Sequence, residues 1–130
     1  MEKLVIEATK YTPEVNFDCE NHLLEIKGKS YPENTSVFYK PVFEWLEKYL
    51  QQAGDEEISV NMELIYFNSS SSKILMDFCD VLDAAAGNGK TITVNWIYEQ
   101  DDEDALEFGE EFQEELESVS FNLVEKAPEK

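Results

Sequence analysis

Residues 57–89 read EISVNMELIYFNSSSSKILMDFCDVLDAAAGNG, and this stretch carries the clearest strand and helix patterns in the chain. Apolar and polar residues alternate in its first part, which predicts a strand over 57–67. Serines follow, and apolar residues then recur at helical spacing, which predicts a helix from about Ser71 to Ala86. The side chains expected to face the core are those of Ile74, Leu75, Phe78, Cys79, Leu82 and Ala86. Gly87-Asn88-Gly89 ends the helix, because glycine readily adopts the backbone conformation of a helix C-terminus.

Further elements are predicted on both sides of this unit. Four more strands are expected, over 3–8, 22–27, 91–98 and 119–124. One helix opens at residues 32–36 and runs to Gly54, and an acidic helix covers 101–116. Pro41 fits the first of these helices only if the regular helix begins close to it, since proline lacks the N–H of a helix interior. The stretch 9–18 is expected to be extended or turn-like.

The predicted order of elements is ββαβαβαβ. Strands and helices that alternate along a chain indicate an α/β layer in which most strands are parallel. We therefore expect one domain over 1–125, with a mixed, mostly parallel five-stranded sheet and helices packed against it. The first two strands, with the turn at 18–21, suggest an N-terminal hairpin. Residues 126–130 are expected to form a short tail.

The chain is strongly acidic. Its 130 residues contain 29 Asp and Glu and ten basic residues, all of them Lys, for a formal net charge of −19. Proteins that bind nucleic acid or anionic membranes neutralise phosphates with Lys and Arg clusters, so this balance argues against both partners. No segment has the roughly 20 apolar residues of a membrane helix, and the N-terminus lacks a signal sequence. We therefore expect a cytoplasmic protein, in which Cys19 and Cys79 are free thiols.

No catalytic or metal-binding arrangement can be assembled from the sequence. His22 is the only histidine and is expected to be a partly exposed structural residue. The acids at 101–104 are typical of the first turn of a helix, where they complement the helix dipole. Residues 87–91 resemble the end of a phosphate-binding loop, but they leave a helix and enter a strand, which is the wrong order. We expect no catalytic residues, no metal and no cofactor.

The segment Asn68–Lys73 lies between the strongest strand and its helix, at the edge where α/β sheets usually place function. A serine there can cap the helix by accepting a hydrogen bond from a free N–H group. Four consecutive serines exceed what a cap needs, and they present several hydroxyls at a helix start. Phosphorylation would add about −1.5 to −2 charges where the helix dipole tolerates them. The spacing leaves two interpretations open, a helix cap and a regulatory phosphorylation site.

Several motifs together resemble one known family. They are Thr9-Lys10-Tyr11-Thr12-Pro13-Glu14-Val15-Asn16-Phe17-Asp18, Gly28-Lys29-Ser30-Tyr31-Pro32-Glu33-Asn34-Thr35, Phe38-Tyr39-Lys40-Pro41-Val42, Trp45-Leu46, Tyr66-Phe67-Asn68-Ser69-Ser70-Ser71-Ser72-Lys73, Val94-Asn95-Trp96 and Phe121-Asn122-Leu123. In combination they resemble the SiaC family of bacterial regulatory phosphoproteins, over almost the whole chain.

This resemblance implies a fold like the STAS domain of anti-anti-sigma factors and no enzymatic activity. It implies a partner-switch protein, phosphorylated by a dedicated kinase and dephosphorylated by a PP2C-like phosphatase. The unphosphorylated form would bind an effector such as a diguanylate cyclase and so promote cyclic di-GMP signalling and biofilm formation. The family's acceptor directly follows the Tyr-Phe-Asn segment, which implies Ser69 here, with Ser70 and Ser71 as alternates. The residues expected to contact the partner are Asn68, Ser69, Ser70, Ser71, Ser72 and Lys73.

The acidity supports an alternative from another class, a protein that mimics nucleic acid and blocks a basic partner. Residues 99–117 hold eleven acids and no base, and such a row can imitate a row of phosphates. A mimic should lose its partner steeply as salt rises, because salt screens exposed charges. A phosphorylation switch should respond instead to changes at Ser69.

Overall fold

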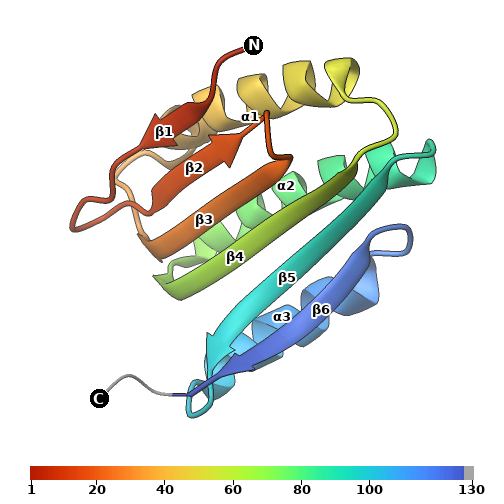
Figure 1. Ribbon diagram of the computed structural model, residues 1–130. Coiled ribbons are helices and arrows are strands. Elements are labelled where there is room, and N and C mark those ends of the chain that lie inside the picture. The colour runs from red at the N-terminus through yellow and green to blue at the C-terminus, as the bar shows by residue number, and fades with distance from the viewer. Residues whose placement is uncertain (128–130) are drawn as a thin grey trace.

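The computed structural model describes residues 1–127, which form one sheet of six strands and three helices. The elements are β1 (Leu4–Ile6), β2 (Glu14–Asp18), β3 (Leu23–Ser30), α1 (Thr35–Gln52), β4 (Glu57–Phe67), α2 (Ser69–Gly87), β5 (Thr91–Glu99), α3 (Glu103–Glu115) and β6 (Ser120–Lys126). The strands follow one another in sequence order across the sheet. β1, β2 and β3 pair antiparallel, whereas β3 to β6 pair parallel. All three helices cover the same face (Figure 1), so the predicted mixed, mostly parallel α/β layer is confirmed.

The sheet has six strands, and the prediction of five was wrong. The additional strand is β2, which lies between β1 and β3 and pairs with both. Only two apolar residues alternate in it, Val15 and Phe17, and both are fully buried. Two apolar residues next to a proline are too weak a pattern to identify a strand, and the hairpin accordingly joins β2 to β3. Of the predicted tail, Lys126 belongs to β6, and residues 128–130 lie outside the described residues.

α1 begins at Thr35, so the expectation that regular helix starts close to Pro41 was wrong. Asn34 starts this helix, because its side chain accepts a hydrogen bond from the N–H of Val37 at 3.1 Å. Pro41 has no N–H, so the carbonyl of Val37 lacks its usual partner within the helix. Both residues are exposed, and water can hydrate that carbonyl.

The helices bury their apolar stripes against the sheet. Of the six α2 residues predicted to face the core, Leu75, Phe78, Cys79 and Leu82 are buried, and Ile74 and Ala86 are half-buried against them. α3 approaches β5 closely at Gly109, where a Cβ atom would lie 2.6 Å from Cδ1 of Trp96. Trp96 also donates its ring N–H to the carbonyl of Ala105 at 2.8 Å. These contacts fix the position of α3 beside the sheet.

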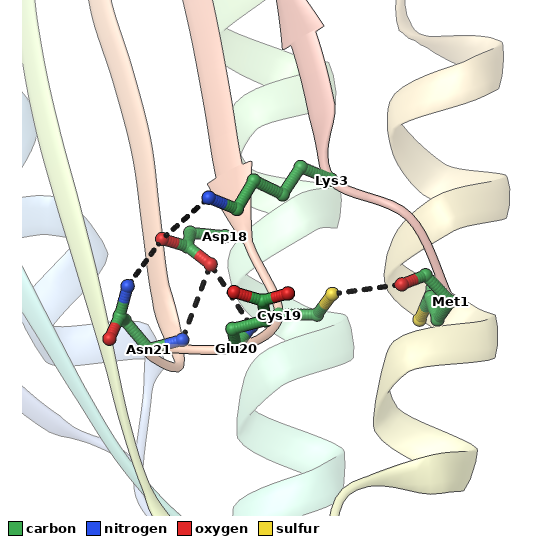
Figure 2. Close-up of polar contacts among 6 residues, drawn as sticks. All are labelled: Met1, Lys3, Asp18, Cys19, Glu20 and Asn21. Atoms are coloured by element: carbon green, nitrogen blue, oxygen red, sulfur yellow. Dashed lines mark hydrogen bonds and ion pairs between the residues drawn. The ribbon is translucent and has the colours of Figure 1, made fainter.

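Asp18 organises the turn between β2 and β3 (Figure 2). Its carboxylate accepts hydrogen bonds from the backbone N–H groups of Glu20 at 3.0 Å and Asn21 at 3.2 Å. The side chain of Asn21 donates a further bond at 2.7 Å, and the Lys3 ammonium lies 3.6 Å away. These groups, led by the Asn21 side chain, hold the pKa of Asp18 below its usual value despite some desolvation. The turn predicted at 18–21 is thus present and is held by side chains.

The face of the sheet without helices carries linked polar side chains. A row of side chains crosses it, in which Asn122 donates to Asn95 at 3.1 Å, Asn95 to Asn61 at 3.0 Å and Asn61 to Glu25 at 3.3 Å. Linked amides of this kind satisfy one another's hydrogen-bonding groups across β3 to β6. Within residues 1–127, no helix combines the length and the apolar character needed to cross a membrane.

Candidate functional site

Asn68 caps α2, and the interpretation of a serine as the cap was wrong. Its side-chain oxygen accepts the N–H of Ser71 at 2.9 Å, and its carbonyl accepts the N–H of Ser72 at 2.9 Å. The N–H of Asn68 donates to the carbonyl of Ser30 at 3.2 Å, which ties the cap to the end of β3. The helix therefore begins at Ser69, two residues before the predicted start, and none of the four serines is needed as its cap.

Ser71 is fully buried and belongs to a chain of three hydroxyl groups. Its Oγ lies 2.8 Å from Oγ of Ser30, which in turn lies 2.7 Å from the hydroxyl oxygen of Tyr39. Burial raises the pKa of Tyr39 to about 12 and outweighs the opposite effect of the Ser30 hydrogen bond, so this phenol stays protonated at neutral pH. We call Ser71, Ser30 and Tyr39 the hydroxyl chain. It joins α2 to β3 and α1, and its burial disfavours Ser71 as an acceptor of phosphate.

Ser69 and Ser70 are the exposed members of the serine run. In the part of the chain that the structure describes, no hydrogen bond involves the hydroxyl of either residue, whereas Ser72 donates its own to the carbonyl of Ser69 at 2.9 Å. The four serines thus divide into two with structural contacts and two whose hydroxyls face solvent. Ser69 and Ser70 are therefore the two serines of the run that are exposed at the surface.

The charges around Ser69 favour an added phosphate. α2 is described over its whole length, and its first turn contains no acidic residue. The free N–H groups of a helix start carry partial positive charge, which stabilises an anion there. Lys73 is exposed and follows Ser69 by four residues, so the two side chains lie on the same face of the helix one turn apart. A phosphate on Ser69 would have both the helix start and the Lys73 ammonium beside it.

The start of α1 adjoins this site, which the sequence did not predict. A hollow of about 470 Å³ is lined by Ser70, Lys73, Ile74 and Asp77 from α2 and by residues 33–36 at the start of α1. The two helix starts meet because each follows the carboxyl end of one of two neighbouring parallel strands, β3 and β4 (Figure 1). The signal was present in the sequence, since Asn34-Thr35-Ser36 repeats the chemistry of Asn68-Ser69-Ser70.

Three tyrosines gather at the same edge of the sheet. The ring of Tyr31 lies edge-on to Tyr11 at 5.3 Å and to Tyr66 at 5.4 Å between centroids. Tyr11 is 52% and Tyr66 is 53% exposed, so the cluster presents aromatic surface next to the serine run. Tyrosine suits protein interfaces because it combines apolar area with a polar hydroxyl. No local pattern predicted this cluster, since its members come from three separate segments of the chain.

His22 lies at the opposite end of the sheet, where its carbonyl accepts the N–H of Ser59 near the start of β4. Its Nδ1 lies 2.6 Å from the hydroxyl of Tyr49, and its Nε2 lies 3.6 Å from the carboxylate of Glu56. Its side chain is 23% exposed, in keeping with the partly exposed structural residue that we expected. Residues 1–127 contain no group of three or more His, Cys, Asp or Glu side chains that could hold a metal ion.

The acidic run, the glycine-containing turn and the two cysteines have structural roles. Asp102 caps α3 by accepting the N–H of Ala105 at 3.1 Å, so the acidic run is a helix start. Gly89, with φ +110°, forms the turn between α2 and β5, so this segment leaves a helix and enters a strand, as predicted. Cys19 is half-buried, Cys79 is buried, and both are free thiols. Burial raises the pKa of Cys79, which makes its thiol unreactive.

Comparison with known proteins decides the family. The model of one family, described as "SiaC family regulatory phosphoprotein", matches residues 6–126. The chain belongs to the SiaC family. The resemblance seen in the sequence is thereby confirmed. The family consists, by its description, of regulatory phosphoproteins. A relative in Pseudomonas aeruginosa (strain UCBPP-PA14), named "Uncharacterized protein PA14_02130", is 34% identical over 115 residues, which are 88% of this chain and 90% of that protein.

Solved structures of the SiaC family share the fold. SiaC of Pseudomonas aeruginosa matches with a TM-score of 0.88 and 31% identity, over 97% of this chain and 100% of that chain. A chain from the crystal structure of the diguanylate cyclase SiaD in complex with its activator SiaC matches with a TM-score of 0.83 and 33% identity. That match covers 96% of this chain and 99% of the other. The homologous SiaC is thus an activator of a diguanylate cyclase.

Proposed function

We propose that this SiaC family member is a non-enzymatic partner switch controlled by reversible phosphorylation of Ser69. A dedicated kinase adds the phosphate, and a PP2C-like phosphatase removes it. The unphosphorylated protein binds an effector such as a diguanylate cyclase and so takes part in cyclic di-GMP signalling that leads to biofilm formation. The complex of the homologous SiaC with the cyclase SiaD supports the choice of effector.

The observation that supports this proposal most directly is that the residues at the start of α2 have different structural roles. Asn68 caps the helix, Ser71 is buried in the hydroxyl chain, and the hydroxyls of Ser69 and Ser70 face solvent. Ser69 directly follows the Tyr66-Phe67-Asn68 segment, the position that the resemblance implies for the acceptor. Ser70 is the alternate with the same exposure, and Ser71 is the alternate that burial disfavours.

The expected mechanism is a change of charge and hydration at the contact surface. Unmodified Ser69, Ser70 and Lys73 dock on the effector. A phosphate adds about −1.5 to −2 charges, which must be desolvated on docking and which repel any acidic surface of the effector. It also engages Lys73 within the helix, so that this cation no longer contacts the effector. A loss of about 3 kcal/mol weakens affinity more than a hundredfold, which is enough for a switch.

Phosphorylation by the cognate kinase, followed by mass spectrometry of the peptides, tests the acceptor. We expect one phosphate on Ser69, its loss in Ser69→Ala and its retention in Ser70→Ala. Phosphate on a residue outside 69–72 would contradict the site.

Effector binding tests the switch itself. The phosphorylated protein should bind about a hundredfold more weakly than the unphosphorylated protein, and Ser69→Ala should bind as tightly as the unphosphorylated protein and ignore the kinase. Ser120→Asp, at an exposed position at the start of β6, adds a charge away from the site and should bind normally. Equal effector binding with and without phosphate would count against the proposal.

A further inference from the structure

A groove between α2 and α3 has an apolar floor, in which Met76 and Phe108 are half-buried and Phe112 is buried. It has a volume of about 400 Å³, and its apolar lining consists of Met76 from α2 with Phe108 and Phe112 from α3. Phe108 also lines a smaller hollow of about 130 Å³ that reaches Ile65 and Tyr66 on β4. Ile65 and Tyr66 are each more than half exposed, so the apolar surface continues beyond the first hollow. We call the larger hollow the α2–α3 groove.

Three acids border this groove and outnumber its one lysine, Lys73. Glu111, Glu114 and Glu115 line it and are exposed, and none of them takes part in an ion pair within residues 1–127. Burial is the largest influence that raises the pKa of Asp80 on α2, and repulsion from Asp77 and Glu115 adds to it. Asp80 is thus close enough to Glu115 for their charges to repel, and in the described part of the chain the one lysine in the lining, Lys73, forms no ion pair with the acids of the groove.

We infer that the α2–α3 groove binds a positively charged amphipathic helix of a partner protein. An apolar groove takes the apolar face of such a helix, and Lys or Arg residues on its flanks would pair with Glu111, Glu114 and Glu115. Residues 108–115 of α3 run along the groove for about 10 Å, which is two helical turns. A partner helix with apolar residues at positions i, i+3 or i+4, and i+7 matches that length.

Charge also argues against a second copy of this chain as the occupant. Each copy carries a formal net charge of −19, so one copy meets repulsion at this acidic rim. The inference goes beyond the proposed function and does not depend on it. The hollow beside Ser70 lies between α1 and α2, whereas this groove lies between α2 and α3, and Lys73 lines both. A partner helix can occupy the groove whether or not Ser69 is an acceptor.

A synthetic helix tests the inference directly. The probe is a fluorescently labelled 18-residue peptide of Leu and Lys, with all Leu on one helical face. The control peptide has the same composition in an order that spreads Leu around the helix. At physiological ionic strength we expect the amphipathic peptide to bind at least tenfold more tightly than the control by fluorescence anisotropy. Equal affinities would show binding through charge alone and would overturn the inference.

Matched protein variants locate the binding. Glu111→Lys combined with Glu114→Lys reverses two charges in the groove, and Glu44→Lys combined with Glu47→Lys reverses two exposed charges on α1. The groove pair should weaken peptide binding at least tenfold, and the α1 pair less than threefold. Met76→Lys, in the half-buried apolar lining, should weaken binding with only one added charge. Similar losses in both double variants would overturn the assignment to the groove.

NMR spectra with the unlabelled peptide give an independent readout. Shifts should concentrate on Met76, Phe108 and Phe112, and shifts spread evenly over the surface would overturn the inference. Sedimentation of the protein alone tests the other occupant, since a dimer that is lost in the Glu111→Lys, Glu114→Lys variant would assign the groove to a second copy. Failure of peptide binding leaves the response of effector binding to Ser69 phosphorylation unaffected, so the two proposals fail separately.

Discussion

The starts of α1 and α2 share a cap but differ in what lies beneath it. Asn34 and Asn68 each accept the N–H of the residue three positions later, at 3.1 and 2.9 Å. That residue is Val37 in α1, which is 68% exposed, and Ser71 in α2, which is fully buried. Local chemistry therefore begins both helices, but only in α2 is the third helical residue buried in the core.

This difference agrees with the proposed switch at the start of α2. The hydroxyl chain holds the first turn of α2 against β3 and α1, so Ser69 is presented from a fixed helix start. A phosphate added to a fixed start changes the surface that a partner meets and leaves the helix in place. The start of α1 has similar residues but lacks this anchor at the third position of the helix.

Placing an acid at the third residue of each helix should separate the two starts most strongly. We expect Ser71→Asp to lower the free energy of unfolding by more than about 4 kcal/mol, because it places a carboxylate in a buried site. Val37→Asp should change it by less than about 0.5 kcal/mol, since an exposed acid in a first turn suits the helix dipole. Urea denaturation followed by circular dichroism measures both. Equal effects would show that the first turn of α2 is not anchored.

Removing each asparagine cap should also destabilise the protein more at α2 than at α1, but the two losses should differ less than for the acid substitutions. Asn68→Ala should cost about 1–2 kcal/mol of stability and Asn34→Ala about 0.5–1 kcal/mol. The reason is that the N–H of Ser71 lies beneath the surface and loses its acceptor, whereas the N–H of Val37 can bond to water. The same denaturation experiment applies, and a larger loss for Asn34→Ala would contradict the comparison.

The hydroxyl chain also predicts a dependence on pH. Tyr39→Phe should lower stability by about 1 kcal/mol at pH 8, because one buried hydrogen bond is lost. The pKa of Tyr39 is raised to about 12 in the folded protein, while an unfolded tyrosine ionises near pH 10. Between these values the unfolded chain has lost a proton that the folded chain keeps, so the stability contributed by Tyr39 falls as pH rises.

The wild-type protein and Tyr39→Phe should therefore differ less in free energy of unfolding as pH rises. We expect the difference to shrink by about 1 kcal/mol between pH 8 and pH 11. Urea midpoints at pH 8, 10 and 11 measure it. Tyr66→Phe, on the exposed tyrosine cluster, is the control and should match the wild-type protein at each pH. If the difference in free energy of unfolding stays constant with pH, Tyr39 does not titrate as a buried phenol.

Local sequence patterns predicted most of the fold. Each strand or helix buries one side against the same core, and that side is visible as a periodic pattern of apolar residues. The alternation in 57–67 and the helical spacing after Ser71 placed β4 and α2 correctly within two residues at either end. β2 was missed, since its burial comes from its neighbours β1 and β3 and not from a pattern of its own.

The site was predictable in position but not in detail. The sequence placed four serines at a strand-to-helix junction, yet it could not distinguish them. Burial of Ser71 depends on Ser30 and Tyr39, which lie 41 and 32 positions away in the chain. The capping role of Asn68 was visible in principle, because asparagine is as good a cap as serine. The contribution of 33–36 required knowledge that β3 and β4 are adjacent.

The strictly sequential order of the strands has a consequence for how the molecule is made. Each new strand pairs with the one synthesised before it, so the sheet can grow in the order in which the chain leaves the ribosome. The hydroxyl chain draws only on residues up to Ser71, whereas the α2–α3 groove needs residues up to Glu115. During synthesis the anchor of α2 can therefore be in place while the groove beside it does not yet exist.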